Sequence, residues 1–215
     1  MKNPVIPQIL TQGVPLKQAV QMAEQEDETI RQHFFTQSNL YQRDSHALDF
    51  DQCVFDHCTW QNSLLQRVHF RHAVFTHCDF SNMEFDNCSF MFVEMRDCKL
   101  TGATFNDCVF QDWLIKDTLA NLSNYHSCKI KQAQIKETIL KDSSWQLCTL
   151  QQVLWDQCEM SGIEFFQTSL KGQDFSTCQI EGLTVSDSAY ELHGLTVNSL
   201  QAADLSRYLQ LLIKK

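Results

Sequence analysis

Every fifth residue of this chain, from Phe50 to Leu205, is apolar or aromatic. There are 32 such positions, and Ala120 is the one small residue among them. The pattern runs without interruption over about 155 residues. A repeat of this kind constrains the whole fold, because each unit must place the same kind of side chain in the same environment.

The ten cysteines follow the same period of five. All their residue numbers end in 3 or 8, so each cysteine precedes a large apolar position by two residues: Cys53, Cys58, Cys78, Cys88, Cys98, Cys108, Cys128, Cys148, Cys158 and Cys178. No Cys-x-x-Cys pair occurs, so the pattern indicates a repeat instead of a zinc site or a disulfide framework. We therefore expect free, buried thiols that act as small hydrophobic side chains, which favours a reducing, cytoplasmic compartment.

A period of five matches neither the 3.6-residue turn of a helix nor the two-residue alternation of a strand. It indicates flat sides joined by tight corners, with one large and one small side chain of every five pointing inward. Units 78–82 (CDFSN), 98–102 (CKLTG) and 103–107 (ATFND) resemble the pentapeptide repeat, whose usual form is Ala-(Asp/Asn)-Leu-X-X. The resemblance covers about three quarters of the chain.

This resemblance implies an all-β solenoid, a right-handed quadrilateral β-helix with four pentapeptides in each 20-residue coil. The repeat would then form about 8 coils, which we place at residues 39–203. Parallel strands of successive coils lie about 4.8 Å apart, so the rod would be about 38 Å long. That length is close to one turn of B-DNA, about 34–36 Å.

Residues 1–38 lack the repeat and form the expected N-terminal segment. From Pro15 a helical spacing of apolar residues is present: Leu16, Val20, Ala23, Ile30 and Phe34. A helix over residues 15–36 would cap the open first coil, because an uncovered solenoid end exposes strand edges and core. A partner-binding arm is the alternative interpretation of this segment.

Residues 204–215 also depart from the repeat and predict a short C-terminal helix. Four apolar side chains share one face of it: Leu205, Tyr208, Leu209 and Leu212. An apolar patch of this kind usually meets a partner. The tail resembles the C-terminal segment through which Qnr-type pentapeptide repeat proteins dimerise, which implies a homodimer.

The charge balance is 17 Lys+Arg against 26 Asp+Glu, a net charge of −9 at pH 7. This acidity speaks against direct binding to nucleic acid, which usually requires a basic face. No apolar run approaches the roughly 18 residues of a membrane helix, and the N-terminus lacks the pattern of a signal peptide. We expect a cytoplasmic protein with neither nucleic acid nor membrane as a partner.

The side of the rod centred on residues 55, 75 and 95 holds acidic residues in almost every coil. This set, here called the acidic wall, comprises Asp56, Glu94, Asp97, Asp117, Glu137, Asp156 and Asp174. Carboxylates on a rod of this length can imitate a DNA phosphate backbone. Arg96, Lys116 and Lys136 cancel part of that field, and an acidic surface is also expected for solubility alone.

The resemblance implies a function for such a surface. Dimeric, acidic pentapeptide repeat proteins of the Qnr/MfpA-like group occupy the DNA-binding saddle of gyrase and protect type II topoisomerases from poisons or toxins. DNA gyrase or topoisomerase IV is therefore the expected partner. The alternative is a structural or protein-interaction scaffold with no topoisomerase role, and a secreted effector is a third class with no visible export signal.

An enzyme is not expected, because the chain has no glycine-rich phosphate loop and no catalytic motif. His57 and His77 share a column with Asp97, Asp117 and Glu137, in which a metal or acid–base site is conceivable. Polar residues on a flat solvent-facing side explain the column more simply. The sequence thus predicts no catalytic, cofactor-binding or metal-binding residues and no cofactor.

One interior stretch, residues 113–125, is irregular. Trp113 occupies a small-residue position and Ala120 a large-residue position, while Leu114, Leu119 and Leu122 lie at outward positions. This predicts a distorted side or an exposed apolar patch that binds a partner. Alternatively, Trp113 and Ala120 exchange sizes so that the local core volume is conserved.

Overall fold

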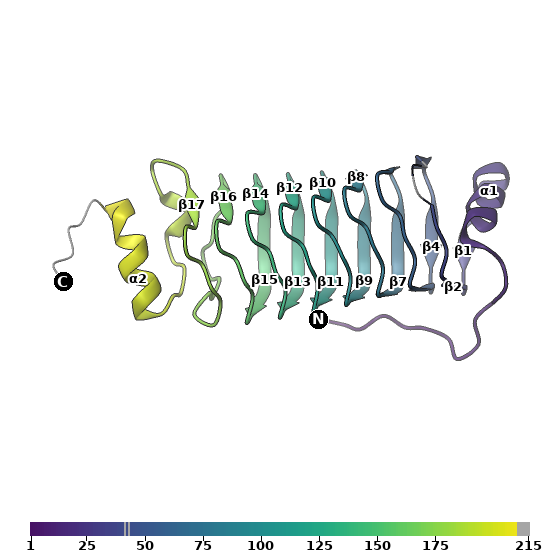
Figure 1. The fold of residues 1–215 in the computed structure, drawn as a ribbon, viewed down its shortest axis with the longest axis horizontal. Coiled ribbons are helices and arrows are strands. Elements are labelled where there is room, and N and C mark those ends of the chain that lie inside the picture. The colour runs from purple at the N-terminus through teal and green to yellow at the C-terminus, as the bar shows by residue number, and fades with distance from the viewer. Residues whose placement is uncertain (41, 43, 210–215) are drawn as a thin grey trace.

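The computed structural model describes residues 1–209 except residues 41 and 43. It is a parallel β-solenoid of about 8 turns with a helix at each end, which confirms the expected fold class. Figure 1 shows the coils stacked along one axis, with α1 (Leu16–Glu26) at one end and α2 (Ser199–Leu205) beyond the last strand at the other.

Two parallel sheets run along the rod. The first has nine strands: β1 (Ile30–Arg31), β2 (Phe34–Thr36), β4 (Asp49–Asp51), β5 (Val54–Asp56), β7 (His69–Thr76), β9 (Ser89–Arg96), β11 (Val109–Lys116), β13 (Lys129–Lys136) and β15 (Thr149–Asp156). Its path is β1-β4-β7-β9-β11-β13-β15, with β2 paired to β5 and β5 to β7. The five longest strands of this sheet each bend around a corner: β7, β9, β11, β13 and β15. The sheet therefore covers two adjacent faces of the rod.

The second sheet covers another face with eight short strands. These are β3 (Ser45–His46), β6 (Leu64–Gln66), β8 (Glu84–Asp86), β10 (Thr104–Asn106), β12 (Asn124–His126), β14 (Ser144–Gln146), β16 (Glu164–Phe166) and β17 (Thr184–Val185). The remaining face is held by a ladder of single parallel bridges, from Asn39–Thr59 to Glu159–Gln179.

The register between coils is 20 residues, as the sequence predicts. Phe90, for example, pairs with Phe70 on one side and Phe110 on the other. Corners occur every five residues, and most corner residues have a left-handed backbone, such as Asn82 with φ of 55° and Asp97 with φ of 51°. Asn, Asp and Gly tolerate this conformation best, which explains why short polar residues recur there.

The core is a set of stacked columns of large side chains. In one column the ring centroids of Phe85 and Phe105 are 4.7 Å apart, those of Phe105 and Tyr125 are 4.9 Å apart, and those of Tyr125 and Trp145 are 4.0 Å apart. All four side chains are fully buried. Because the same contact repeats in each coil, this apolar column accounts for the cohesion of the rod.

The N-terminal cap is present but shorter than expected. α1 ends at Glu26 and buries Leu16, Ala19, Val20 and Ala23. Ile30 and Phe34, which the sequence assigned to the same helical stripe, lie in β1 and β2 instead. The helix stops because Asp27 adopts a left-handed conformation. The solenoid therefore starts before residue 39, with Ile30 paired to Phe50.

The C-terminal end also differs from the expected boundaries. After the 3₁₀ turn η1 (Tyr190–Leu192), α2 begins at Ser199, before residue 204, and is followed by η2 (Ser206–Leu209). Asn198 starts the helix, because its side chain accepts hydrogen bonds from the backbone N–H groups of Leu200 and Gln201 in a capping box. Leu200 continues the period of five in the sequence, but it is 79% exposed.

The side at residues 113–125 is not distorted, so that expectation is wrong. β11 keeps its register with β9 and β13 along its whole length. Trp113 and Ala120 are both fully buried, and Leu114 is nearly so. The expected apolar patch is reduced to Leu119 and Leu122, whose side chains are 41% and 61% exposed.

An N-terminal segment, residues 1–9, lies along the outside of the rod and reaches the level of β11 (Figure 1). The backbone N–H of Val5 donates to His72 Nδ1 at 3.1 Å, and the N–H of Lys2 donates to the buried Asp112 carboxylate at 2.5 Å. Gln52 Nε2 donates to the Val5 carbonyl. Because residues 52, 72 and 112 share one column of corners, the segment follows a single edge of the rod.

Candidate interaction surfaces

The acidic wall follows one face of the first sheet. Asp56, in β5, and Asp156, in β15, belong to one ladder of register partners. Asp97, Asp117 and Glu137 are corner residues of three successive coils, with φ between 48° and 51°. Their backbone N–H groups bond to the next coil, which fixes them in a column.

The remaining acidic-wall residues occupy the same side. Glu94 is in β9, and Asp174 forms a bridge with Thr196 after the last long strand. Hydrogen bonds from the Ser176 hydroxyl and backbone N–H lower the pKa of Asp174. Asp174 therefore supports its own turn as well as contributing charge.

Ion pairs neutralise the middle of the acidic wall. Lys116 Nζ lies 3.5 Å from Asp117 Oδ2 and 3.4 Å from Glu137 Oε2, and Arg96 contacts Glu94. Asp97 and Asp156 are outside these pairs among the residues that the structure describes. Uncompensated negative charge thus remains at Asp97, within the wall, and at Asp156, nearer its C-terminal end.

The face formed by the second sheet carries a second acidic set, which the sequence analysis did not single out. It comprises Glu84, Asp86, Asp107 and Glu164. Gln66 Nε2 donates to Asp86 at 2.7 Å and the Ser144 hydroxyl donates to Glu164 at 3.0 Å. No cation lies within ion-pair distance of these four carboxylates in the described part of the chain. Reading the sequence in columns of 20 residues would have revealed this set.

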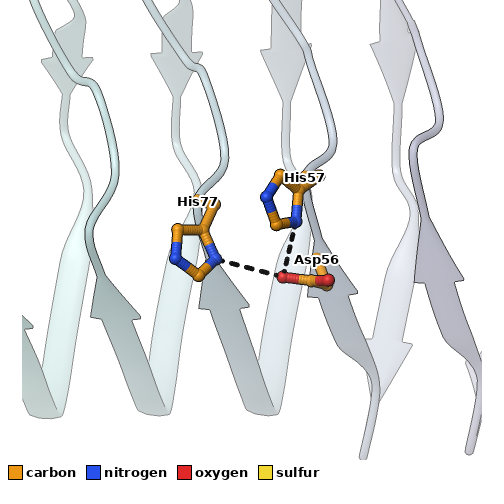
Figure 2. Close-up of side chains that lie close together, drawn as sticks. All are labelled: Asp56, His57 and His77. Atoms are coloured by element: carbon orange, nitrogen blue, oxygen red, sulfur yellow. Dashed lines mark hydrogen bonds and ion pairs between the residues drawn. The ribbon is translucent and has the colours of Figure 1, made fainter.

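A carboxylate and two imidazoles, those of Asp56, His57 and His77, lie close together near the N-terminal end of the acidic wall. Figure 2 shows His57 and His77, on neighbouring coils, both directed at Asp56. Asp56 Oδ1 lies 3.0 Å from His57 Nδ1 and 3.3 Å from His77 Nδ1. The two imidazole rings stack with centroids 4.5 Å apart. The sequence column placed these histidines above Asp97 but missed Asp56, the acid that they contact.

The environment of Asp56 favours its charged form. Partial burial raises its pKa, but hydrogen bonds from His57, Thr76 and His77 outweigh that cost and hold the pKa below its ordinary value. The Thr76 hydroxyl donates to Asp56 Oδ1 at 2.8 Å. The carboxylate is therefore oriented by three donors from two coils.

The ten cysteines are free and buried, as the period of five predicts. Burial raises the pKa of the Cys53 thiol to about 11. Most thiols donate to backbone carbonyls one coil away, as Cys88 does to Leu65 at 3.2 Å. They act as small core residues that also satisfy backbone acceptors.

The C-terminal residues expected at a dimer interface are partly described. Leu205 packs against the core and is half-buried, and the Tyr208 hydroxyl donates to the Leu183 carbonyl at 2.8 Å. The Leu209 side chain and Leu212 lie outside the described residues. Leu205 and Tyr208 line an open apolar hollow together with Leu192 and Val197. Their role in dimerisation stays a prediction.

None of the helices within residues 1–209, less 41 and 43, is long and apolar enough to cross a membrane.

A family model described as the pentapeptide repeat region matches residues 48–125 and 68–145. No curated protein is similar to the chain in sequence.

Among solved structures, the chain is similar to HetL, a pentapeptide repeat protein involved in heterocyst differentiation regulation from the cyanobacterium Nostoc sp. strain PCC 7120. The identity is 10% and the TM-score 0.55, covering 82% of this chain and 96% of HetL. A trypsin-treated form of QnrB1, a plasmid-mediated fluoroquinolone resistance protein, matches with 17% identity and a TM-score of 0.43, covering 85% of this chain and 90% of that one.

At 10% identity the likeness to HetL speaks for the fold alone. The repeat sequence, the 20-residue register and the family match agree with one another. A pentapeptide repeat region therefore spans residues 48–145 of this chain, within a solenoid of the pentapeptide repeat type.

Proposed function

We propose that this protein is a non-enzymatic interaction rod that binds a type II topoisomerase, gyrase or topoisomerase IV, in place of DNA. Its acidic wall would occupy the cationic DNA-binding surface and so protect the enzyme from a poison or toxin. Assembly through the C-terminal helix into a homodimer, and action in the cytoplasm, are parts of the same proposal.

One observation supports it above the others: Asp97, Asp117 and Glu137 form a column with one carboxylate in each of three coils. A column of coils places such charges about 4.8 Å apart. A regular array of negative charge attracts a surface that evolved to bind phosphates. The ten free thiols support the cytoplasmic location, because unpaired cysteines persist in reducing compartments.

A second candidate, a protein-interaction scaffold without a topoisomerase role, is favoured by a different observation. Lys116 and Arg96 pair with three acids in the middle of the acidic wall. A surface selected to resemble DNA has no evident need of cations at its centre. On this account the acidic residues serve solubility, and the exposed Leu119 and Leu122 provide a docking patch.

Charge reversal separates the two candidates. The test variant carries Asp97→Lys, Asp117→Lys and Asp156→Lys. The matched control carries Glu84→Lys, Asp107→Lys and Glu164→Lys on the second sheet, so both variants have the same net charge. Binding to purified gyrase and topoisomerase IV is measured by surface plasmon resonance at several salt concentrations.

The proposal predicts that the test variant loses at least about tenfold in affinity, because like charges would face each other, while the control retains binding. It also predicts that wild-type affinity falls steeply with salt. Unchanged binding in the test variant would favour the scaffold. An equal loss in both variants would show that net charge, and not the acidic wall, governs binding.

A further inference from the structure

Asp56, His57 and His77 present three potential ligand atoms within a small volume. One ring nitrogen from each histidine and an Asp56 carboxylate oxygen all lie within 4.8 Å of one another. Two adjacent coils supply them, since Asp56 pairs in register with Thr76, the residue before His77. The site is open to solvent: the histidine side chains are about half exposed, at 55% and 52%.

The spacing of these atoms suits a tetrahedral metal ion. Ligands about 2.0–2.1 Å from zinc are separated from each other by about 3.3 Å along the edges of a tetrahedron. Asp56 Oδ1 is 3.0 Å from His57 Nδ1 and 3.3 Å from His77 Nδ1. Two of the three edges are therefore already close to the required length.

The chemistry of the donors also suits such an ion. Imidazole nitrogen with carboxylate oxygen favours Zn²⁺, Cu²⁺ and Ni²⁺ over the all-oxygen sites of Mg²⁺ and Ca²⁺. Each Nδ1 can offer its lone pair when the ring proton is on Nε2. Because the stacked rings are almost parallel, with 19° between their planes, at least one of these exposed rings must also rotate to bring both lone pairs onto one ion. The metal would then replace the hydrogen bonds that now join each ring to Asp56.

The fold brings the three groups together before any ion binds. His57 and His77 are corner residues, each with φ of 53°, so their backbones are fixed by the repeat. The Thr76 hydroxyl, 2.8 Å from Asp56 Oδ1, orients the carboxylate from outside the ligand set. Hydrogen-bonded support of this kind typically accompanies protein metal ligands.

We propose that Asp56, His57 and His77 form a binding site for a divalent first-row transition metal of the Zn²⁺ class. Three protein ligands leave one of four tetrahedral positions open to water or to a donor from a partner. The bound ion would join two successive coils and stabilise the N-terminal part of the rod. It would also reverse the local charge at that end of the acidic wall. The inference does not depend on the proposed topoisomerase partner.

The test uses the full chain after chelator treatment, under reducing conditions. ZnCl₂ is titrated into the protein by calorimetry, and Co²⁺ is used as a spectroscopic probe of tetrahedral coordination. The variants are His57→Asn, His77→Asn and the double substitution, because Asn tolerates the left-handed corner conformation. His46→Asn is the matched control, since His46 is an exposed histidine of the second sheet.

We expect one Zn²⁺ per wild-type chain, a rise in melting temperature with metal, and Co²⁺ absorption bands typical of tetrahedral geometry. Each single variant should lose at least about tenfold in affinity, and the double variant should lose the site, while His46→Asn binds as wild type. No saturable binding to wild type at sub-millimolar Zn²⁺ would overturn the proposal. Equal binding by wild type and the double variant would overturn it too, because it would place the metal elsewhere, such as on the cysteines.

Discussion

Lys116 bridges two coils of the rod, with its Nζ 3.5 Å from Asp117 of the same corner and 3.4 Å from Glu137 of the next coil. The charge of Asp117, followed by the charge and the hydrogen bond of Glu137, raises the pKa of Lys116. The pairs are exposed, so their direct contribution to stability is small. Their main effect is on the field of the acidic wall, whose centre they neutralise.

If the acidic wall binds a cationic surface, removing this lysine strengthens binding. We predict that Lys116→Gln raises topoisomerase affinity by a few-fold at low salt, because Asp117 and Glu137 are then uncompensated. Lys99→Gln is the control, since it changes the net charge equally on a different face. Both affinities are measured by surface plasmon resonance. An equal gain in the two variants, or none in either, would contradict a role for the wall itself.

The stacked core makes a separate prediction about stability. Phe105→Ala should lower the free energy of unfolding by about 3–5 kcal/mol, because the ring stacks on both Phe85 and Tyr125. Phe92→Ala is the control, since Phe92 is a partly exposed corner residue whose ring stacks on His72. Urea unfolding followed by circular dichroism compares the two. A similar loss in both variants would argue against the column as the main source of cohesion.

Most of the solenoid follows from the sequence, because its period is also the period of its backbone. A large residue at every fifth position, with a small one two residues earlier, predicts the corners, the 20-residue register and the burial of Cys53 to Cys178. The series does not predict the first coil, because the polar Ser45 interrupts the run of apolar residues at every fifth position. Ile30, Phe35 and Leu40 continue that series and are buried.

Other features depend on relations that a periodic pattern does not contain. Asp112 is buried and accepts a hydrogen bond from Lys2, 110 residues earlier in the chain. Asp56 meets His77 because its side chain turns along the rod toward the next coil. At the C-terminal end, the capping box of Asn198 overrides the period of five at Leu200. Side-chain direction and local capping decided these outcomes.

Thiol reactivity tests the burial of the cysteines. All ten thiols are buried in the packed core, out of reach of a reagent in solution, and burial also raises the pKa of the Cys53 thiol to about 11, so little of its thiolate is present at neutral pH. We predict almost no reaction of the native protein with Ellman's reagent, and reaction of all ten cysteines in guanidinium chloride. A Leu122→Cys variant is the positive control, because Leu122 is 61% exposed. Rapid native reaction of several wild-type thiols would contradict the packed core.

Asp56 predicts a pH dependence of stability. Its pKa is lower in the folded protein than in the unfolded chain, because the donated hydrogen bonds of His57, Thr76 and His77 outweigh partial burial. Its stabilising contribution is therefore complete above the unfolded pKa of about 3.9 and is lost as the pH falls through the lower folded value.

Melting temperatures between pH 3 and pH 7 should accordingly fall less steeply on acidification in Asp56→Asn than in the wild type, with the two curves converging at the acidic end. Asp107→Asn serves as the control for removal of an exposed carboxylate at another corner. Parallel curves for wild type and Asp56→Asn over this range would show that the contacts of Asp56 do not stabilise the fold.

The most direct test of the proposed function is a DNA gyrase supercoiling assay with the purified protein, with and without a gyrase poison. The account predicts that low protein concentrations protect gyrase from the poison and that high concentrations inhibit supercoiling, because the acidic wall competes with DNA. No effect at micromolar protein on either gyrase or topoisomerase IV would contradict it, and the scaffold would then be the better account.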